Sequence, residues 1–139
     1  MIQSYDIIRE IILILYYNMK KEYVPKSLTP ADKKKQVKSI KEKTDRPKVK
    51  SFTSKRSTHT VAFERKYGTK ISDDKYIVKN IIGRVGMNKI LDKGRAAYYS
   101  SGSRPNQTAE SWALARLASV ITGGKAREVD KDIWDKYKK

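Results

Sequence analysis

Residues 93–127 read KGRAAYYSSGSRPNQTAESWALARLASVITGGKAR, and they carry the clearest signals of local structure in the chain. Pro105 fixes its own φ and biases the residue before it toward an extended conformation, so the chain is still a loop there. Thr108 can then cap a helix, because its hydroxyl accepts from the free amides of the first turn. Glu110 places a negative charge at the positive end of the helix dipole. A helix is therefore expected to begin at Ala109.

This helix is apolar along one face. Its apolar side chains recur at the 3.6-residue helical period and are Ala113, Leu114, Leu117, Ala118, Val120 and Ile121. Gly123 and Gly124 can adopt the left-handed conformation that ends a helix. Trp112, at the edge of the apolar face, is expected to anchor the helix in a core or at an interface. The pattern predicts a central buried helix from Ala109 to about Thr122.

The loop ahead of this helix is rich in hydrogen-bond donors. Exposed amides and the positive dipole of a helix N-terminus suit an anion such as a phosphate or carboxylate, and nearby basic side chains could add charge. The residues of this candidate anion or partner site are Ser100, Ser101, Ser103, Arg104, Asn106, Arg95, Arg116 and Lys125. The alternative is an ordered turn whose hydroxyls satisfy the backbone of the turn itself. The spacing of a Walker loop is absent.

The same part of the chain resembles the signature of a known family. Residues 94–126, GRAAYYSSGSRPNQTAESWALARLASVITGGKA, are similar to a small family of unknown function that we associate with large DNA viruses of eukaryotic hosts and with some phages. The similarity begins near Tyr23, in EYVPKSLTPADKKKQ, and reaches about Trp134. The resemblance implies a viral setting and brings no catalytic residues with it.

Net charge and composition limit the possible partners. The chain of 139 residues carries 32 Lys and Arg against 15 Asp and Glu, a formal net charge of +17. So large an excess favours acidic partners, whether nucleic acid, an acidic protein surface or anionic lipid. Cysteine is absent, which excludes disulfides, thiolate chemistry and cysteine metal sites. The length is sufficient for one modest domain with an arm.

Residues 1–19, MIQSYDIIREIILILYYNM, form the one apolar segment that is free of lysine. Its uninterrupted apolar run from Ile11 to Tyr17 is too short to span a bilayer. The segment also lacks the basic start and cleavage site of a signal peptide. A buried strand and an amphipathic helix docked on a partner are the two structural alternatives. A further hypothesis is that the natural start is Met19, which opens MKKEYVP.

Residues 20–59 are predicted to form a basic arm. Thr29 and Pro30 indicate the start of a helix that runs to about Lys43, but its thin apolar face needs a partner surface. The following TDRPKVKSFTSKRST is expected to be extended, and it could bind phosphates or thread across acidic neighbours. The alternative is a solvated, disordered linker. The candidate contacts of the arm are Lys33, Lys34, Lys35, Arg46, Lys48, Lys50, Lys55 and Arg56.

Residues 60–139 are predicted to form a helical domain, so the fold class is mainly α. The helices expected in addition to the central one are a short helix before Gly68, a helix capped by Asp73 through Ile82, a short helix from Met87 to Lys93 closed by Gly94, and a terminal helix from Val129 to Tyr137. A helix-turn-helix at the Gly83–Gly86 break is disfavoured, because the second helix is too short for recognition. A minor strand pair at Val49–Phe52 or Ala96–Tyr99 is the other alternative.

The sequence indicates no catalytic constellation. His59 is the one histidine and lies in the basic arm, and no base is signalled beside the loop serines. Asp73 with Asp74, or Asp130 with Asp132, could bind Mg²⁺. Both pairs occur where helix-cap carboxylates are expected, and that interpretation is favoured. We therefore expect no enzyme, no cofactor and no metal.

Two binding functions remain. In the leading hypothesis the protein is a virion structural component, a minor capsid or cement protein that bridges neighbouring capsid proteins through its basic arm and apolar N-terminus. In the alternative it is a virion protein that binds the DNA or RNA backbone without base specificity, and Tyr98, Tyr99 or Phe52 stack on unpaired bases. Both hypotheses place the protein in the virion, and in the host cytoplasm or nucleus during assembly, with no membrane span.

Overall fold

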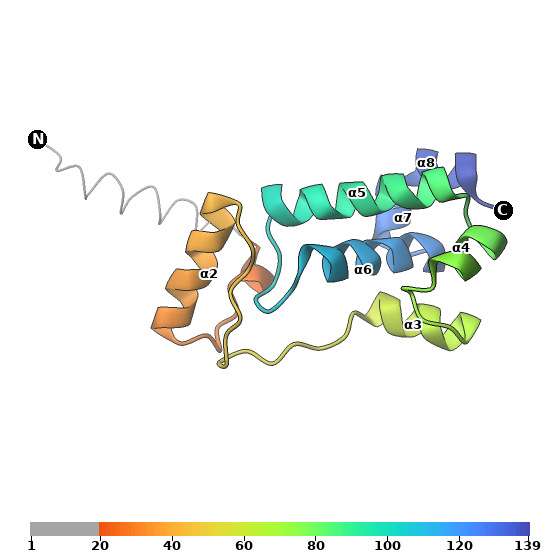
Figure 1. Cartoon of the computed structure of the whole chain (residues 1–139). Helices are drawn as coiled ribbons and strands as arrows, with labels where there is room; N and C mark the ends of the chain where they lie inside the picture. The colour runs from red at the N-terminus through yellow and green to blue at the C-terminus, as the bar shows by residue number, and fades with distance from the viewer. Residues whose placement is uncertain (1–19) are drawn as a thin grey trace, which may run out of the picture. The chain divides into compact units, whose positions relative to one another are not determined.

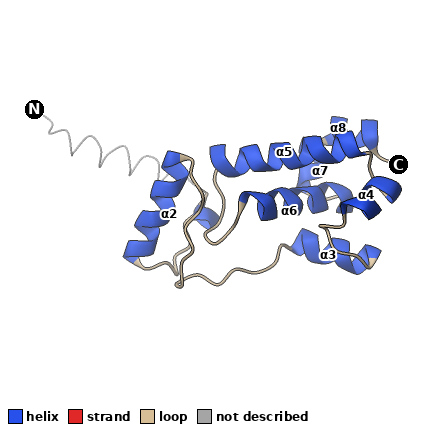
Figure 2. Ribbon diagram, viewed as in Figure 1, coloured by secondary structure: helices blue, strands red, loops and turns tan. Residues whose placement is uncertain are grey.

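The computed structural model describes residues 20–139, and the predictions for residues 1–19 lie outside this range. The described part is built from helices and loops (Figures 1 and 2). In chain order these are the 3-10 helix η1 (Lys21–Tyr23) and the α-helices α2 (Pro30–Glu42), α3 (Thr58–Tyr67), α4 (Asp74–Asn80), α5 (Arg84–Ser100), α6 (Ala109–Thr122), α7 (Lys125–Val129) and α8 (Lys131–Tyr137). The prediction of a mainly α fold is confirmed.

The predicted strand pair is wrong for both candidate segments. Residues 49–52 lie in a loop, and residues 96–99 lie inside α5. The described residues contain no strand, and their one β pairing is an isolated antiparallel bridge between Ile82 and Lys138. The tyrosines and alanines at 96–99 are helical because they continue the helix that begins at Arg84.

The chain divides into two compact units. Residues 20–54 and 102–107 form one, which we call the basic unit, and residues 55–101 and 108–139 form the other, which we call the helical unit. The division predicted at 59/60 differs from this one, because α3 already begins at Thr58 and the loop between α5 and α6 belongs to the basic unit.

The basic unit is a folded element with a small core of its own. The apolar cluster at its centre comprises Val24, Leu28, Val37 and Val49, and Phe52 packs against them. Thr29 caps α2 through its Oγ1, which accepts from the Asp32 amide at 3.2 Å. After α2 the chain turns at Lys43, whose φ is 57°, and residues 44–54 return without regular secondary structure. The segment predicted to be an extended arm therefore contributes Val49 to a core.

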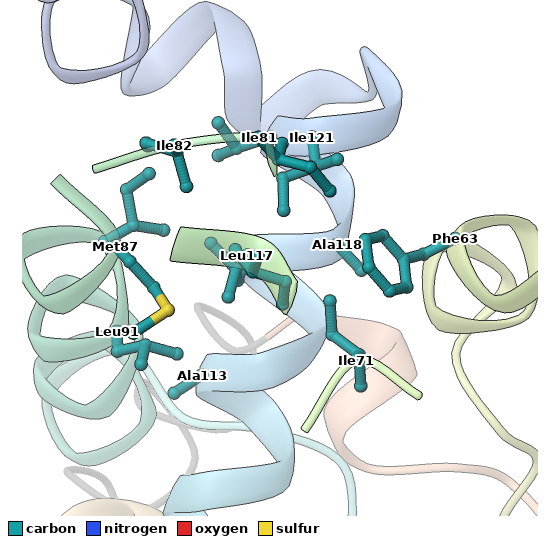
Figure 3. Close-up of a cluster of buried hydrophobic side chains, with 13 residues drawn as sticks. Phe63, Ile71, Ile81, Ile82, Met87, Leu91, Ala113, Leu117, Ala118 and Ile121 are labelled. Carbon is teal, nitrogen blue, oxygen red and sulfur yellow. The ribbon is translucent and has the colours of Figure 1, made fainter. Parts of the chain in front are cut away.

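The core of the helical unit is centred on α6, which packs against α5, α3 and α7. Figure 3 shows Phe63 from α3 pointing toward Ala118 of α6, and Leu117 of the same helix lies within the buried cluster. The buried cluster comprises Phe63, Ile71, Ile77, Ile81, Ile82, Met87, Ile90, Leu91, Ala113, Leu117, Ala118, Val120 and Ile121. Burial of this cluster is the main source of stability in the unit, at roughly 25 cal/mol for each Å² of apolar surface removed from water.

The central helix α6 has the predicted bounds and caps. Thr108 Oγ1 accepts from the Ser111 amide, and Ser111 Oγ accepts from the Thr108 amide, so the two residues form a capping box. At the other end Gly123 has φ 81°, the left-handed conformation that a glycine adopts without strain. Both signals are local in the sequence, which is why they predict the helix correctly.

A break separates α4 from α5 as predicted, but it lies at residues 81–83 rather than Gly83–Gly86, and the predicted helix end at Gly94 is wrong. Gly83 is the N-cap of α5, but Gly86 and Gly94 lie inside this 17-residue helix. A Cβ at Gly86 would be 2.4 Å from Cβ of Tyr137, and a Cβ at Gly94 would be 2.7 Å from Cα of Ala113. These glycines let α8 and α6 approach the backbone of α5, so their role is close packing rather than helix termination.

The chain after α6 also differs from the prediction. The expected terminal helix from Val129 to Tyr137 is two short helices, α7 and α8, with Asp130 at their junction. Ile133 and Trp134 pack against the core as expected. The helix α4 ends at Asn80, two residues before the predicted Ile82.

Candidate functional site

The residues of the predicted anion site are divided between the two units. Ser103, Arg104 and Asn106 belong to the basic unit. The other five belong to the helical unit and are Arg95, Ser100, Ser101, Arg116 and Lys125. The contacts within each unit show what these side chains do.

In the basic unit, Asn106 holds the segment that follows α2. Its Oδ1 accepts from the Val49 amide at 2.6 Å, and its Nδ2 donates to the Phe52 carbonyl at 2.9 Å. Its own amide donates to the Pro47 carbonyl at 3.1 Å. Asn106 has φ 67°, a conformation that asparagine tolerates better than most residues. The side chain proposed to meet an anion thus bonds the backbone of Val49 and Phe52 through both its oxygen and its nitrogen.

Ser103 contributes its backbone to a second buried link in the basic unit. Gln36 is fully buried on α2, and its Nε2 donates both to the Ser103 carbonyl and to the Tyr23 carbonyl, each at 2.8 Å. Three segments that are distant in the sequence therefore meet at one amide. Arg104 remains half exposed and pairs with Glu22 at 3.9 Å. The Ser103 hydroxyl donates to the Arg104 carbonyl at 3.2 Å, as the ordered-turn alternative expects, and the anion site stays a prediction.

In the helical unit, the two predicted arginines are paired with carboxylates. Arg95 lies 2.9 Å from Glu110 and 2.9 Å from Asp92. Arg116 binds Asp130 through two hydrogen bonds of 2.8 Å each. The serine and lysine side chains play lesser roles in the fold: Ser100 donates to the Ala96 carbonyl of its own helix, and Ser101 and Lys125 are exposed.

Asp130 is the centre of a buried ion-pair cluster that joins α5, α6 and the start of α8. The residue is 1% exposed, and Lys93 approaches it to 3.0 Å beside Arg116. Burial by itself raises the pKa of a carboxyl group, but the hydrogen bonds from Arg116 and Lys93 outweigh burial and lower the pKa of Asp130. Asp130 is the N-cap residue of α8, as its position predicted, but its side chain makes no cap hydrogen bond and pairs with Arg116 and Lys93 instead.

Asp73 does cap a helix as predicted. Its Oδ1 accepts from the Tyr76 amide at 3.2 Å, and Thr69 Oγ1 donates to its other oxygen at 2.7 Å. These two hydrogen bonds lower the pKa of Asp73. Within residues 20–139 no three His, Asp or Glu side chains gather as a metal site would require. His59 lies on α3, where it contacts the Gly124 turn of the same unit.

The predicted basic contacts differ in their availability. Arg46 is 5% exposed and donates to the Thr44 carbonyl, and Arg56 pairs with Glu64. The lysines of the basic unit are on its surface. Those that are exposed include Lys34, Lys35, Lys48 and Lys50 from the sequence prediction, and also Lys38, Lys41 and Lys43, which the prediction did not single out. A helical-face analysis of α2 could have found Lys38 and Lys41, because they continue the row of Lys34.

The basic unit carries a high charge with few internal counter-ions. It has 13 Lys and Arg against 4 Asp and Glu, a net charge of +9, while the larger helical unit has 18 against 9 and the same net charge. In the basic unit Arg104 pairs with Glu22 at 3.9 Å, and Asp45 and Arg46 are also engaged. The pairs of Arg56, Arg84, Lys93, Arg95, Arg116 and Lys138 lie in the helical unit. The described lysines of the basic unit form no salt bridge.

The large apolar side chains that are exposed in the described chain lie in the helical unit, apart from the exposed lysines of the basic unit. The large hydrophobic residues that are exposed in residues 20–139 are Val85, Tyr99 and Val129, and all three belong to the helical unit. The aromatic residues expected to stack on bases are mostly covered: Tyr98 is fully buried, and Phe52 packs against the core of the basic unit. Tyr99 is 37% exposed and lies edge-on to Tyr98.

Within residues 20–139, every helix is too short or too polar to cross a lipid bilayer. The described chain is thus a mainly α-helical protein of two units, one of them small and strongly basic. Residues 18–136 match the model of a family of unknown function, DUF5824, and the chain belongs to this family. No curated protein and no solved structure matches the chain. Family membership by itself assigns no activity, so function must be argued from the molecule.

Proposed function

We propose that this protein is a virion protein that binds the phosphate backbone of DNA or RNA without reading base sequence. The observation that carries the proposal is the net charge of +9 on the basic unit, whose described lysines form no salt bridges. Lysines that neutralise phosphates release the counter-ions condensed on a nucleic acid, and this release drives sequence-independent binding. The same lysines repel one another when no polyanion is present.

The form of the basic unit favours this function over the leading expectation of a bridging arm. An arm that threads between capsid proteins should be extended, but residues 20–54 are folded around a core of their own. Protein interfaces are depleted in lysine and depend on buried aromatic or apolar anchors. Among the described residues the basic unit exposes lysines and no large hydrophobic side chain.

A minor capsid or cement protein that bridges its neighbours is the second candidate. The apolar run from Ile11 to Tyr17 favours it, because a phosphate backbone offers no apolar surface to cover such a run. The viral setting of both candidates rests on the resemblance carried by residues 94–126. Both are binding roles without a catalytic step, and both place the protein in the virion and, during assembly, in the host cytoplasm or nucleus.

The proposal is tested by titrating the full-length chain with labelled duplexes of two unrelated sequences at about 50 and 200 mM salt. We expect micromolar binding, equal for the two sequences, that weakens at least about tenfold over this salt range. A folded chain that binds neither duplex at the lower salt overturns the proposal. Fractionation of purified particles provides a second readout: recovery with the genome supports nucleic-acid binding, and recovery with the emptied shell supports the bridging candidate.

A further inference from the structure

We propose that the solvent-facing side of α2 is a contact surface for double-stranded nucleic acid, with Lys34, Lys38 and Lys41 as its central line. This inference rests on the proposed function and specifies where the chain binds and which form of nucleic acid it prefers. It follows from the register of α2, from the lack of an exposed aromatic side chain in the described residues of the basic unit, and from the contacts that fix the helix.

The register of α2 places the three lysines in one row. They are spaced by four and three residues, so they lie on the same helical face, with axial separations of about 6 and 4.5 Å. All three are exposed. The opposite face is buried through Gln36, Val37, Ser39 and Ile40. The row is therefore a line of three positive charges about 10 Å long on one side of a helix.

The acidic residues of α2 leave this row cationic. Asp32, in the first turn, accepts a hydrogen bond from Ser51 Oγ at 2.7 Å. Glu42, in the last turn, is exposed and offsets part of the charge at that end. Lys33 and Lys35 lie beside the row, so α2 carries five lysines against two acids. A polyanion approaching this face would meet a net positive surface.

The aromatic residues of the basic unit favour a duplex over a single strand. Proteins that bind single strands without sequence preference stack the bases on exposed aromatic rings. The two aromatic residues of the described basic unit are Tyr23, which is 5% exposed, and Phe52, which packs on the core. Its lysines can contact phosphates only, and a duplex presents one phosphate charge for about every 1.7 Å of its axis.

Contacts within the basic unit fix the orientation of the lysine row. Thr29 caps the first turn, Ser51 bridges from Thr29 to Asp32, and Gln36 links the buried face to the Tyr23 and Ser103 carbonyls. A face that is ordered before binding loses less conformational entropy when it meets its ligand. The row is thus a preformed surface rather than a set of independent flexible charges.

The test compares two full-length triple variants with the same change of charge. The first replaces the row (Lys34→Gln, Lys38→Gln, Lys41→Gln). The control replaces three exposed lysines of the helical unit that form no salt bridge (Lys70→Gln, Lys79→Gln, Lys131→Gln). Glutamine has nearly the helix propensity of lysine, so both variants should fold, and circular dichroism checks this. Each is titrated with a random-sequence duplex and an oligothymidine single strand.

For the row variant we expect at least tenfold weaker duplex binding at low salt. The slope of log K against log salt should be shallower by about 2 to 3, as the loss of three phosphate contacts predicts. The control should keep the slope and stay within about twofold of the wild-type affinity, and the wild-type chain should bind the duplex more tightly than the single strand.

The possible failures are distinguishable. Equal losses in the row variant and the control would refute α2 as the contact surface and leave the proposed function standing. Single-strand binding as tight as duplex binding would refute the preference for a duplex. A wild-type chain that ignores both nucleic acids but binds polyglutamate would overturn the inference and the proposed function together, and it would favour an acidic protein as the partner.

Discussion

Gly94 of α5 lies directly against Ala113 of α6, so that a Cβ at position 94 would be 2.7 Å from the Ala113 Cα and 3.1 Å from its Cβ. Replacement of a mid-helix glycine by alanine ordinarily stabilises a helix by roughly 0.5–1 kcal/mol. Here the methyl group would meet backbone, which cannot move without separating α5 from α6. We expect Gly94→Ala to lower the free energy of unfolding by about 1–3 kcal/mol, measured by urea denaturation. Asn88→Ala, on the exposed side of α5, is the control and should change stability by less than about 0.5 kcal/mol.

The buried carboxylate of Asp130 should stabilise the fold by neutralising the two cations, Arg116 and Lys93, with which it pairs. Asp130→Asn removes the negative charge and leaves Arg116 and Lys93 facing each other, so the free energy of unfolding should fall by about 3 kcal/mol. Asp132→Asn removes a charge from an exposed neighbour and should have little effect. Equal effects of the two substitutions would show that the cluster contributes only through net charge.

The pH dependence of stability provides an independent check on Asp130. The pKa of its carboxyl group is lower in the folded chain than in the unfolded chain, where it is near 3.9. The stabilisation is therefore fully present above the unfolded pKa and is lost as pH falls through the folded pKa. The stability difference between the wild type and Asp130→Asn should be constant from about pH 7 to pH 5 and should shrink below about pH 4. A difference that persists unchanged at low pH would contradict the assignment.

Asn106 is predicted to hold the return segment of the basic unit through its side chain. Asn106→Ala removes both side-chain hydrogen bonds. It also places alanine, which tolerates positive φ less well than asparagine, at φ 67°, so the free energy of unfolding should fall by about 2 kcal/mol. Asn106→Gly relieves the backbone strain but still lacks the bonds. If the glycine variant is as stable as the wild type, the conformation matters and the bonds do not. Limited proteolysis within residues 44–54 reports the same loosening directly.

Arg127 should stabilise the C-terminal end of α6. Its Nε and Nη2 donate to the Val120 and Ile121 carbonyls at 2.7 Å each, and its guanidinium lies 4.5 Å from the Trp134 ring centroid. Arg127→Met keeps an apolar stem but leaves both carbonyls without this donor, and about 1–2 kcal/mol of stability should be lost in thermal unfolding. Arg65→Met, an exposed arginine on α3, is the matched control, and an equal loss there would contradict this role.

Local signals in the sequence predicted the parts of the fold that depend on neighbouring residues. Thr108 and Gly123 defined α6 because a cap is satisfied within a few residues of itself. The roles of Gly86 and Gly94 could not be predicted in the same way. Each depends on a partner helix whose contact residue, Tyr137 or Ala113, is remote in the sequence. A glycine that permits close packing and one that ends a helix look the same in a single chain.

The candidate site shows the same distinction. Composition indicates an acidic partner, which stays a prediction. The helical period of α2 could have aligned Lys34 with Lys38 and Lys41, but the sequence analysis singled out only Lys34 of these three. The partners of Asn106 and Asp130 were not predictable, because Val49 lies 57 residues from Asn106 and Arg116 lies 14 residues from Asp130. Polar side chains in a loop suggest a ligand until their long-range backbone partners are known.

The basic unit takes its residues from two places in the chain, 20–54 and 102–107. A gene fragment that ends after Ser54 would encode α2 without Asn106 and without the carbonyl that Gln36 binds in Ser103. Recombination between relatives could therefore exchange this unit intact only if it transferred α3, α4 and α5 in the same piece. The α2 face that we propose as a polyanion-binding surface and half of the helical unit should consequently be inherited together, and changes in its affinity should arise by point substitution on α2 rather than by shuffling of modules.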